Sequence, residues 1–116
     1  MTSRLDRLIA ASQANIDFPE KFHDAAMRWA KLDGKAHQLE ELKTAVLAKK
    51  AKALGGDLSV AAAEREVRAG QEWHDFVSEI TQARIAANEA KGEMDYWRMK
   101  FQAWLVAQDH AREQAA

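Results

Sequence analysis

The seven-residue repeat between Trp73 and Ala111 restricts the fold more than any other feature of this sequence. Apolar residues recur there at alternating spacings of three and four, and eleven of the twelve repeat positions are apolar. These positions are Trp73, Phe76, Ile80, Ala83, Ala87, Ala90, Met94, Trp97, Phe101, Trp104, Gln108 and Ala111. Such a seam is typical of a helix that is supercoiled against another helix. It favours an all-α fold.

The few helix-breaking residues suggest where the helices begin and end. The 116-residue chain contains five Gly and one Pro. We predict three helices in a single domain, over about residues 3–14, 19–54 and 59–113. Pro19 suits the first turn of the second helix, and Gly55 with Gly56 provides its C-terminal stop. Within the third helix, Gly70 and Gly92 are the positions where a bend is possible.

A tight turn between the two long helices predicts an antiparallel, coiled-coil-like helical hairpin. Folding the chain about that turn gives the expected neighbours, which are Leu39 with His74, Ala36 with Val77, Trp29 with Ala83 and Ala87, and Phe22 with Ala90. The third helix would then extend beyond the second by roughly 18 residues, or about 27 Å. We expect the short N-terminal helix, through Leu5, Leu8 and Ile9, to pack on this overhang.

The totals exclude several classes of protein. With 17 basic and 18 acidic residues the net charge is −1, so the chain as a whole is not attracted to DNA or to anionic lipid. The absence of Cys excludes disulfides, thiolate nucleophiles and Cys-ligated zinc. No apolar run approaches the roughly 18 residues of a membrane span, and the first residues do not resemble a signal peptide. We therefore predict a cytoplasmic protein without a cofactor.

No group of residues predicts catalysis. A Ser-His-Asp triad cannot be assembled convincingly, and a glycine-rich phosphate loop is absent. In the expected hairpin His37 lies opposite His74, near Glu40, Glu41 and Asp75, and two His with a carboxylate can bind a metal. Their spacing is not that of a metal-binding motif. We therefore predict neither a metal site nor enzymatic activity.

The C-terminal part of the seam is the strongest candidate for an interface. Because the second helix is expected to be too short to cover it, these side chains need the first helix, a second copy or another protein as a partner. The candidate interface residues are Glu93, Asp95, Tyr96, Trp97, Phe101, Trp104 and Leu105. We predict a homodimer that covers the aromatic residues, and a site for a different protein remains the alternative.

Positive charge concentrates around the hairpin turn. The candidate nucleic-acid contacts are Lys43, Lys49, Lys50, Lys52, Arg65 and Arg68. Such a cluster can neutralise phosphates, but cations in the last turns of a helix also compensate the helix dipole. Asp57, Glu64 and Glu66 dilute the cluster, and residues 59–116 contain ten acidic against seven basic residues. This balance favours protein binding over nucleic-acid binding.

Several segments of the third helix resemble a known family. They are Ser59 to Glu66, Trp73, Glu93 to Trp104, and Ala111 to Glu113. In these segments the chain is similar to small all-helical proteins of tailed phages and prophages, which are often encoded near replication and recombination genes and mostly have no assigned activity. The family usually has Arg-Ser after the Trp at position 104, where this chain has Leu105 and Val106. The resemblance implies a phage origin and hence the cytoplasm of an infected bacterium.

These features together predict a non-enzymatic phage accessory protein that acts by binding another protein. Two kinds of partner are compatible with a phage gene of this size. One is the phage's own recombination or replication machinery. The other is a nucleic-acid-processing defence complex of the host, of the CRISPR type, which the protein would inhibit. Direct binding of single- or double-stranded nucleic acid through the basic turn is the alternative, and a purely structural coiled-coil oligomer is a third reading.

Overall fold

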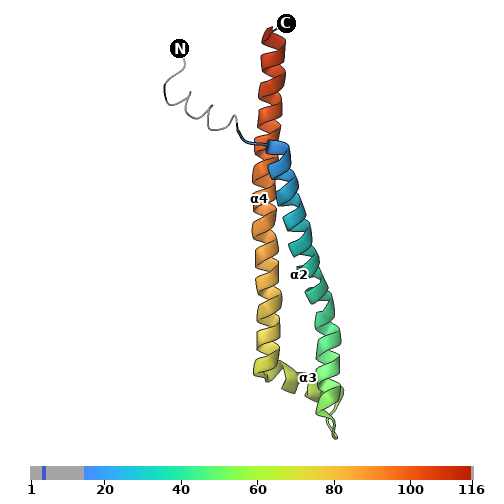
Figure 1. The fold of residues 1–116 in the computed structure, drawn as a ribbon. Coiled ribbons are helices and arrows are strands. Elements are labelled where there is room, and N and C mark those ends of the chain that lie inside the picture. The colour runs from blue at the N-terminus through green and yellow to red at the C-terminus, as the bar shows by residue number, and fades with distance from the viewer. Residues whose placement is uncertain (1–3, 5–14, 116) are drawn as a thin grey trace.

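The computed structural model describes residue 4 and residues 15–115, and every regular element in this part of the chain is a helix (Figure 1). α2 spans Phe18–Leu54, α3 spans Val60–Ala69 and α4 spans Gln71–Ala115. α2 and α4 lie side by side and antiparallel in a rod of 82 × 26 × 17 Å. The predicted all-α antiparallel hairpin is therefore confirmed. The helix predicted over about residues 3–14, with its contact to the overhang, falls outside the part described.

Local capping explains where α2 and α3 begin and where α2 ends. The side chain of Asp17 accepts a hydrogen bond from the backbone N–H of Glu20 at 3.0 Å. At the start of α3, the side chain of Ser59 accepts one from the backbone N–H of Ala62. These side chains satisfy donors that have no partner inside the first turn of a helix. Gly55 and Gly56 end α2 with φ angles of 62° and 76°. Residues with a Cβ rarely adopt such angles, so the Gly-Gly pair is what allows the chain to turn there.

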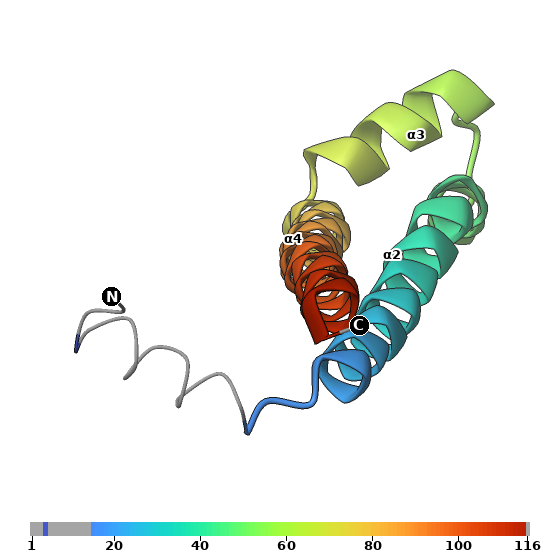
Figure 2. The same ribbon diagram turned by 90° about the horizontal axis from the view of Figure 1, so that it is seen from above.

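The single helix predicted over about 59–113 is wrong, because the structure divides it at Gly70. This residue has extended backbone angles (φ −80°, ψ 154°), and its N–H donates to the carbonyl oxygen of Val67 at 3.1 Å. α4 begins at the next residue, so that α3 lies across the end of the hairpin, between α2 and α4 (Figure 2). Gly92, the other possible bend, lies within unbroken helix.

The burial of Trp73 compensates for the break at Gly70. α2 and α4 separate toward α3 (Figure 1), so a bulky side chain is needed between them at this end. Trp73 fills that space beside Leu47, and each of these two residues is only 7% exposed. The ring of Phe76 lies 5.7 Å from that of Trp73. Burying an aromatic side chain contributes more than the roughly 1 kcal/mol by which Gly weakens a helix.

The register of the hairpin also differs from the predicted one. Arg84 of α4 binds Asp33 and Glu40 of α2, and Arg28 of α2 binds Glu93 of α4. Relative to the prediction, α4 is shifted along α2 by about two helical turns. The reason is that α3 takes up ten residues across the end of the hairpin. The pairs predicted above, Leu39 with His74, Ala36 with Val77, Trp29 with Ala83 and Ala87, and Phe22 with Ala90, assumed the unshifted alignment. In the structure Phe22 stacks on Phe101, and His74 lies at the level of Leu47.

The core between the helices is thin. Among the described residues the buried apolar side chains are Phe18, Ala25, Ala36, Leu47, Ala51, Ala63, Trp73, Ile80, Ala87 and Ala90. Six of these ten are alanine, so α2 and α4 approach closely but remove little apolar area from water. The seam is buried or half-buried as far as Phe101, which agrees with its prediction as a packing surface. Beyond Phe101 the seam positions are exposed.

Candidate interaction surfaces

The aromatic end of the hairpin is partly core. Phe18, at the start of α2, lies between two rings of α4, with centroids 6.4 Å from Trp97 and 6.1 Å from Trp104. Phe22 stacks on Phe101 at 6.3 Å. The expectation that α2 leaves these aromatics bare is therefore wrong. The shifted register brings the start of α2 to the level of Trp104, and α4 extends beyond it only by residues 105–115.

The charged members of the predicted interface have partners of their own. Glu93 accepts a hydrogen bond from Arg28 of α2 at 2.7 Å, which ties the two helices together. Asp95 forms an ion pair with Arg98, one turn further along α4, at 2.8 Å. Both pairs are largely exposed, so each contributes little to stability. Their geometry assigns these carboxylates to the α2–α4 contact and to the surface of α4.

A second apolar face on α4 was missed by the sequence analysis. We call Tyr96, Met99, Ala103 and Val106 the outer stripe. Its three large members are 52%, 67% and 69% exposed, in that order. Spacings of three, four and three place the four residues on one face of the helix, and none of the described elements covers it. The same spacing could have identified the stripe in the sequence. The interface was instead assigned to the aromatic seam beside it, whose apolar pattern is stronger.

Trp104 belongs to the seam, and Leu105 follows it on α4. They are 37% and 42% exposed, so both present apolar area to solvent although Trp104 also contacts Phe18. The ammonium of Lys100 lies 5.5 Å from the ring centre of Tyr96, a cation–π distance that holds this ring against the helix surface. The accessible apolar part of the predicted interface is therefore Tyr96, Trp104 and Leu105.

Arg84 forms the most extensive polar contact between the long helices. Its Nη1 donates to Asp33 at 2.7 Å, and its Nε donates to Glu40 at 3.1 Å while Nη2 donates to the other oxygen of the same carboxylate. Hydrogen bonds from the guanidinium lower the pKa of the Glu40 carboxyl below its ordinary value, and the same bonds raise the pKa of Arg84. The contact fixes the register and keeps Glu40 out of any metal site.

The predicted basic turn is partly neutralised. Lys50 donates to Glu72 at 3.0 Å, and Arg68 lies 3.6 Å from Glu64. In residues 15–115 no carboxylate lies within ion-pair distance of the four remaining candidates, which are Lys43, Lys49, Lys52 and Arg65. These four side chains are exposed. The structure thus leaves a weaker positive patch than the sequence implies.

The histidines considered as metal ligands do not come together. His37 pairs with Glu41 on the same helix at 3.2 Å, and Asp75 accepts a hydrogen bond from Gln71. His74 lies near the start of α4, at the level of Leu47 rather than of His37. No group of three or more His, Asp or Glu side chains that could hold a metal ion exists among the described residues.

No helix in the described part of the chain combines the length and the apolar character that crossing a lipid bilayer requires. Comparison with protein-family models, with curated proteins and with solved structures found no match. The resemblance to helical phage proteins therefore stays a prediction from the sequence.

Proposed function

We propose that this protein is a non-enzymatic helical module that acts by binding protein, and that its first partner is a second copy of itself. The observation that carries the proposal is the outer stripe of α4, an apolar face at helical spacing that the described chain leaves uncovered. Two such stripes can interdigitate in the way that helices pack through residues three and four apart. Tyr96 and Met99 supply the large side chains, and Ala103 allows a close approach.

The thin core supports self-association. The radius of gyration is 24.5 Å, against about 13 Å for a compact domain of this length. None of the large side chains in the described core is fully buried. An elongated hairpin with an alanine-rich contact removes little apolar surface from water and is marginally stable alone. A second copy placed on the outer stripe would bury apolar surface on α4, which carries most of the exposed large apolar side chains.

Sedimentation equilibrium tests the proposed dimer. We expect the parent protein to sediment as a dimer, and the double variant Met99→Glu, Val106→Glu to sediment as a monomer with unchanged helicity. A buried carboxylate without a partner is strongly unfavourable, so two of them at one contact prevent association. The matched control is Met27→Glu with Leu42→Glu, which puts the same charges on α2 at positions 59% and 44% exposed. This control should remain dimeric.

Three outcomes would contradict the dimer. The parent could be monomeric at high concentration, or the stripe variant could keep the parent's mass while remaining folded. The control variant could also dissociate, which would show a general effect of added charge. A mass that grows beyond a dimer with concentration would favour the purely structural coiled-coil oligomer instead.

For the biological target we propose the two classes named above, phage recombination or replication machinery and a CRISPR-type defence complex of the host. The resemblance to phage proteins over residues 59–113 supports this part of the proposal. Two assays with purified components separate the classes, namely DNA cleavage by a CRISPR effector complex and strand annealing by a phage recombinase. The protein should alter one of them, and the stripe variant should lose the effect. No effect on either at a molar excess would contradict both assignments.

Direct nucleic-acid binding through the basic turn is the second candidate. The observation that favours it is the set of exposed cations without an ion pair in the described chain, among them Lys49 and Lys52. If this candidate is correct, affinity falls with salt with a log–log slope of about −0.9 per phosphate neutralised on duplex DNA. Replacing Lys49, Lys50 and Lys52 by Glu would then abolish binding. We expect weak binding in a polarisation assay, and tight, salt-sensitive binding that the triple variant loses would favour this candidate.

A further inference from the structure

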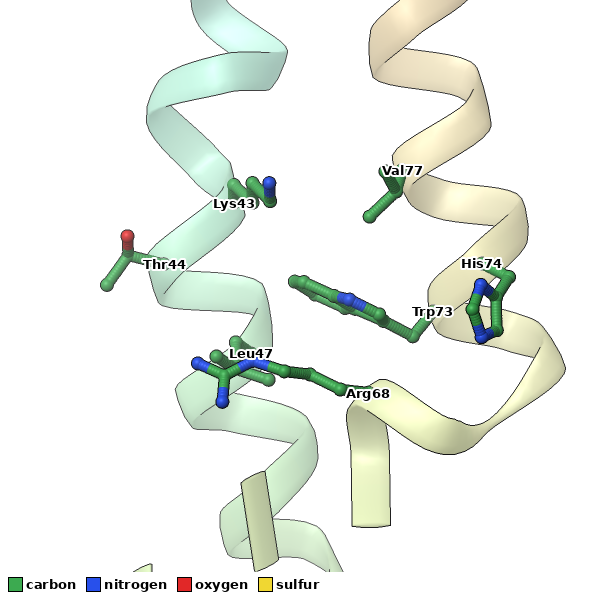
Figure 3. A pocket seen from close by; sticks show the side chains of 7 residues that line it. All are labelled: Lys43, Thr44, Leu47, Arg68, Trp73, His74 and Val77. Carbon is green, nitrogen blue, oxygen red and sulfur yellow. The ribbon is translucent and has the colours of Figure 1, made fainter. Parts of the chain in front are cut away.

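An open groove lies beside Trp73, at the end of the hairpin where α3 crosses from α2 to α4 (Figure 3). Its volume is about 550 Å³, which falls within the roughly 300–1,000 Å³ of small-molecule sites. The lining residues are Lys43, Thr44 and Leu47 of α2, Arg68 of α3, and Trp73, His74 and Val77 of α4. We call it the Trp73 groove. It is at the opposite end of the rod from the outer stripe, and the proposed function does not use it.

Three of the polar groups that line the Trp73 groove, those of Lys43, Arg68 and Trp73, are donors only, while Thr44 and His74 can donate and accept. Lys and Arg side chains donate and cannot accept, and the indole N–H of a Trp also only donates. Lys43 has no ion pair among the described residues, and Arg68 has a single long contact to Glu64, one turn earlier on its own helix. None of the seven lining residues is a carboxylate. A site rich in donors and lacking anionic groups selects an oxyanion.

The groove on the other side of Trp73 is different in charge. It is lined by Lys50, Glu66 and Glu72 among others, and Lys50 already binds Glu72 at 3.0 Å. Positive charge there is compensated within the protein. Of the two, only the Trp73 groove has a lysine without an ion pair among the described residues, Lys43, and the pair of its Arg68 with Glu64 is long, at 3.6 Å.

The break at Gly70 assembles the Trp73 groove. In one straight helix, Arg68 would lie about one and a half turns before Trp73 on the same rod and would not reach α2. Because α3 turns across the hairpin, Arg68 extends toward Leu47 of α2, and Lys43 lies on the other side of the indole in Figure 3. Cationic groups from two different helices thereby face one apolar floor formed by Leu47, Trp73 and Val77.

We propose that the Trp73 groove binds a phosphate ester of mononucleotide size. Lys43 and Arg68 attract the phosphate, and His74 adds a donor at the rim. The apolar floor contacts the organic part of the ester, which inorganic phosphate lacks. The volume of the groove exceeds what a single phosphate fills, and this is why the ligand is an ester rather than the free ion.

Nuclear magnetic resonance of the full chain tests this proposal through the indole N–H signal of Trp73. The probes are adenosine 5′-monophosphate, adenosine and inorganic phosphate, each titrated separately. We expect a saturable shift of the Trp73 signal with the monophosphate, a weaker effect of phosphate and none of adenosine. The Trp73→Phe variant assigns the signal, since the chain contains four Trp.

Three single variants locate the binding. Lys43→Gln and Arg68→Gln should each weaken binding of the monophosphate by about tenfold or more, the usual effect of losing one charge-assisted hydrogen bond. Lys49→Gln is the matched control, because it removes the same charge from the same helix but does not line the groove. It should bind as the parent does. Circular dichroism confirms that all three variants retain their helices.

Several results would overturn the proposal. They are no shift of the Trp73 signal at millimolar monophosphate, equal binding of adenosine, equal binding of inorganic phosphate, or an equal loss in Lys49→Gln. Affinity that grows steadily with the length of an added oligonucleotide would also overturn it. That pattern would indicate that an extended nucleic-acid chain binds along the basic turn. The acidic peptide poly-Glu binding as tightly as the monophosphate would show general anion attraction.

Discussion

Arg84 of α4 binds Glu40 of α2 through two of its nitrogens, with Nε 3.1 Å from one carboxylate oxygen and Nη2 hydrogen-bonded to the other. A third nitrogen of the same guanidinium reaches Asp33, about two turns away on α2. Planar guanidinium and carboxylate groups match only in a narrow range of positions. This contact therefore specifies which turn of α4 faces which turn of α2, whereas the alanine seam beside it would tolerate several alignments.

The Arg84 contact predicts a pH dependence of stability. Arg84 holds the pKa of Glu40 below its ordinary value of 4.5. The stabilisation is therefore complete above pH 4.5, and it is lost as the pH falls through the lower pKa of the folded state. From pH 7 downward, the melting temperature of Arg84→Gln should at first lie below that of the parent by a constant amount. This difference should shrink in acid. Arg98→Gln is the control, because its partner Asp95 is on the same helix. A deficit that does not change with pH would contradict the prediction.

Two glycines should respond in opposite directions to the same substitution. Gly34 lies within α2, and a Cβ added there meets nothing within 4 Å. Gly34→Ala should stabilise the protein by about 0.5–1 kcal/mol, because Ala loses less backbone entropy in a helix. Gly55 has a φ of 62°, so Gly55→Ala should destabilise by about 1–3 kcal/mol. Urea unfolding measures both. Equal signs for the two changes would show that the turn does not have this conformation.

The contact of Phe18 with α4 predicts a change in fluorescence. Phe18 is 5% exposed and lies against Trp97 and Trp104. Phe18→Ala should destabilise by about 3 kcal/mol and shift the tryptophan emission to longer wavelength, because both indoles become more exposed to water. Met27→Ala, at a residue 59% exposed, should change neither quantity. An unchanged emission maximum in Phe18→Ala would mean that the start of α2 does not reach the level of Trp104.

The fully buried Ala87 predicts intolerance to a larger side chain on α4 at this position. Ala87 is fully buried, so Ala87→Leu should overpack the contact and destabilise by about 1–3 kcal/mol. Ala107→Leu adds the same atoms at an exposed position of the same helix and should be nearly neutral. Thermal melts of both variants provide the measurement. If the two variants melt together at the temperature of the parent, α2 does not pack against α4 at Ala87.

The candidate interface shows which part of a surface can be read from sequence. The apolar spacing placed Trp97, Phe101 and Trp104 on one face of a helix, and they are on one face. Whether that face meets water depended on where α2 begins relative to α4, and this is a property of the register. The structure places Phe18 against the aromatics and leaves the outer stripe exposed instead. Met99 and Val106 became candidates only after the seam was known to be occupied.

The sequence by itself determined the helices and their antiparallel order, because periodicity, capping side chains and the Gly-Gly turn are local properties of the chain. Only the tertiary structure decided the break at Gly70, since a straight helix and a broken one differ locally by about 1 kcal/mol. The difference comes from the burial of Trp73 of α4 and Leu47 of α2, which line the same groove between the distant helices. The register followed from that break and from Arg84 reaching Asp33 and Glu40. A repeating apolar seam is nearly the same after a shift of two turns, and so it could not select the alignment alone.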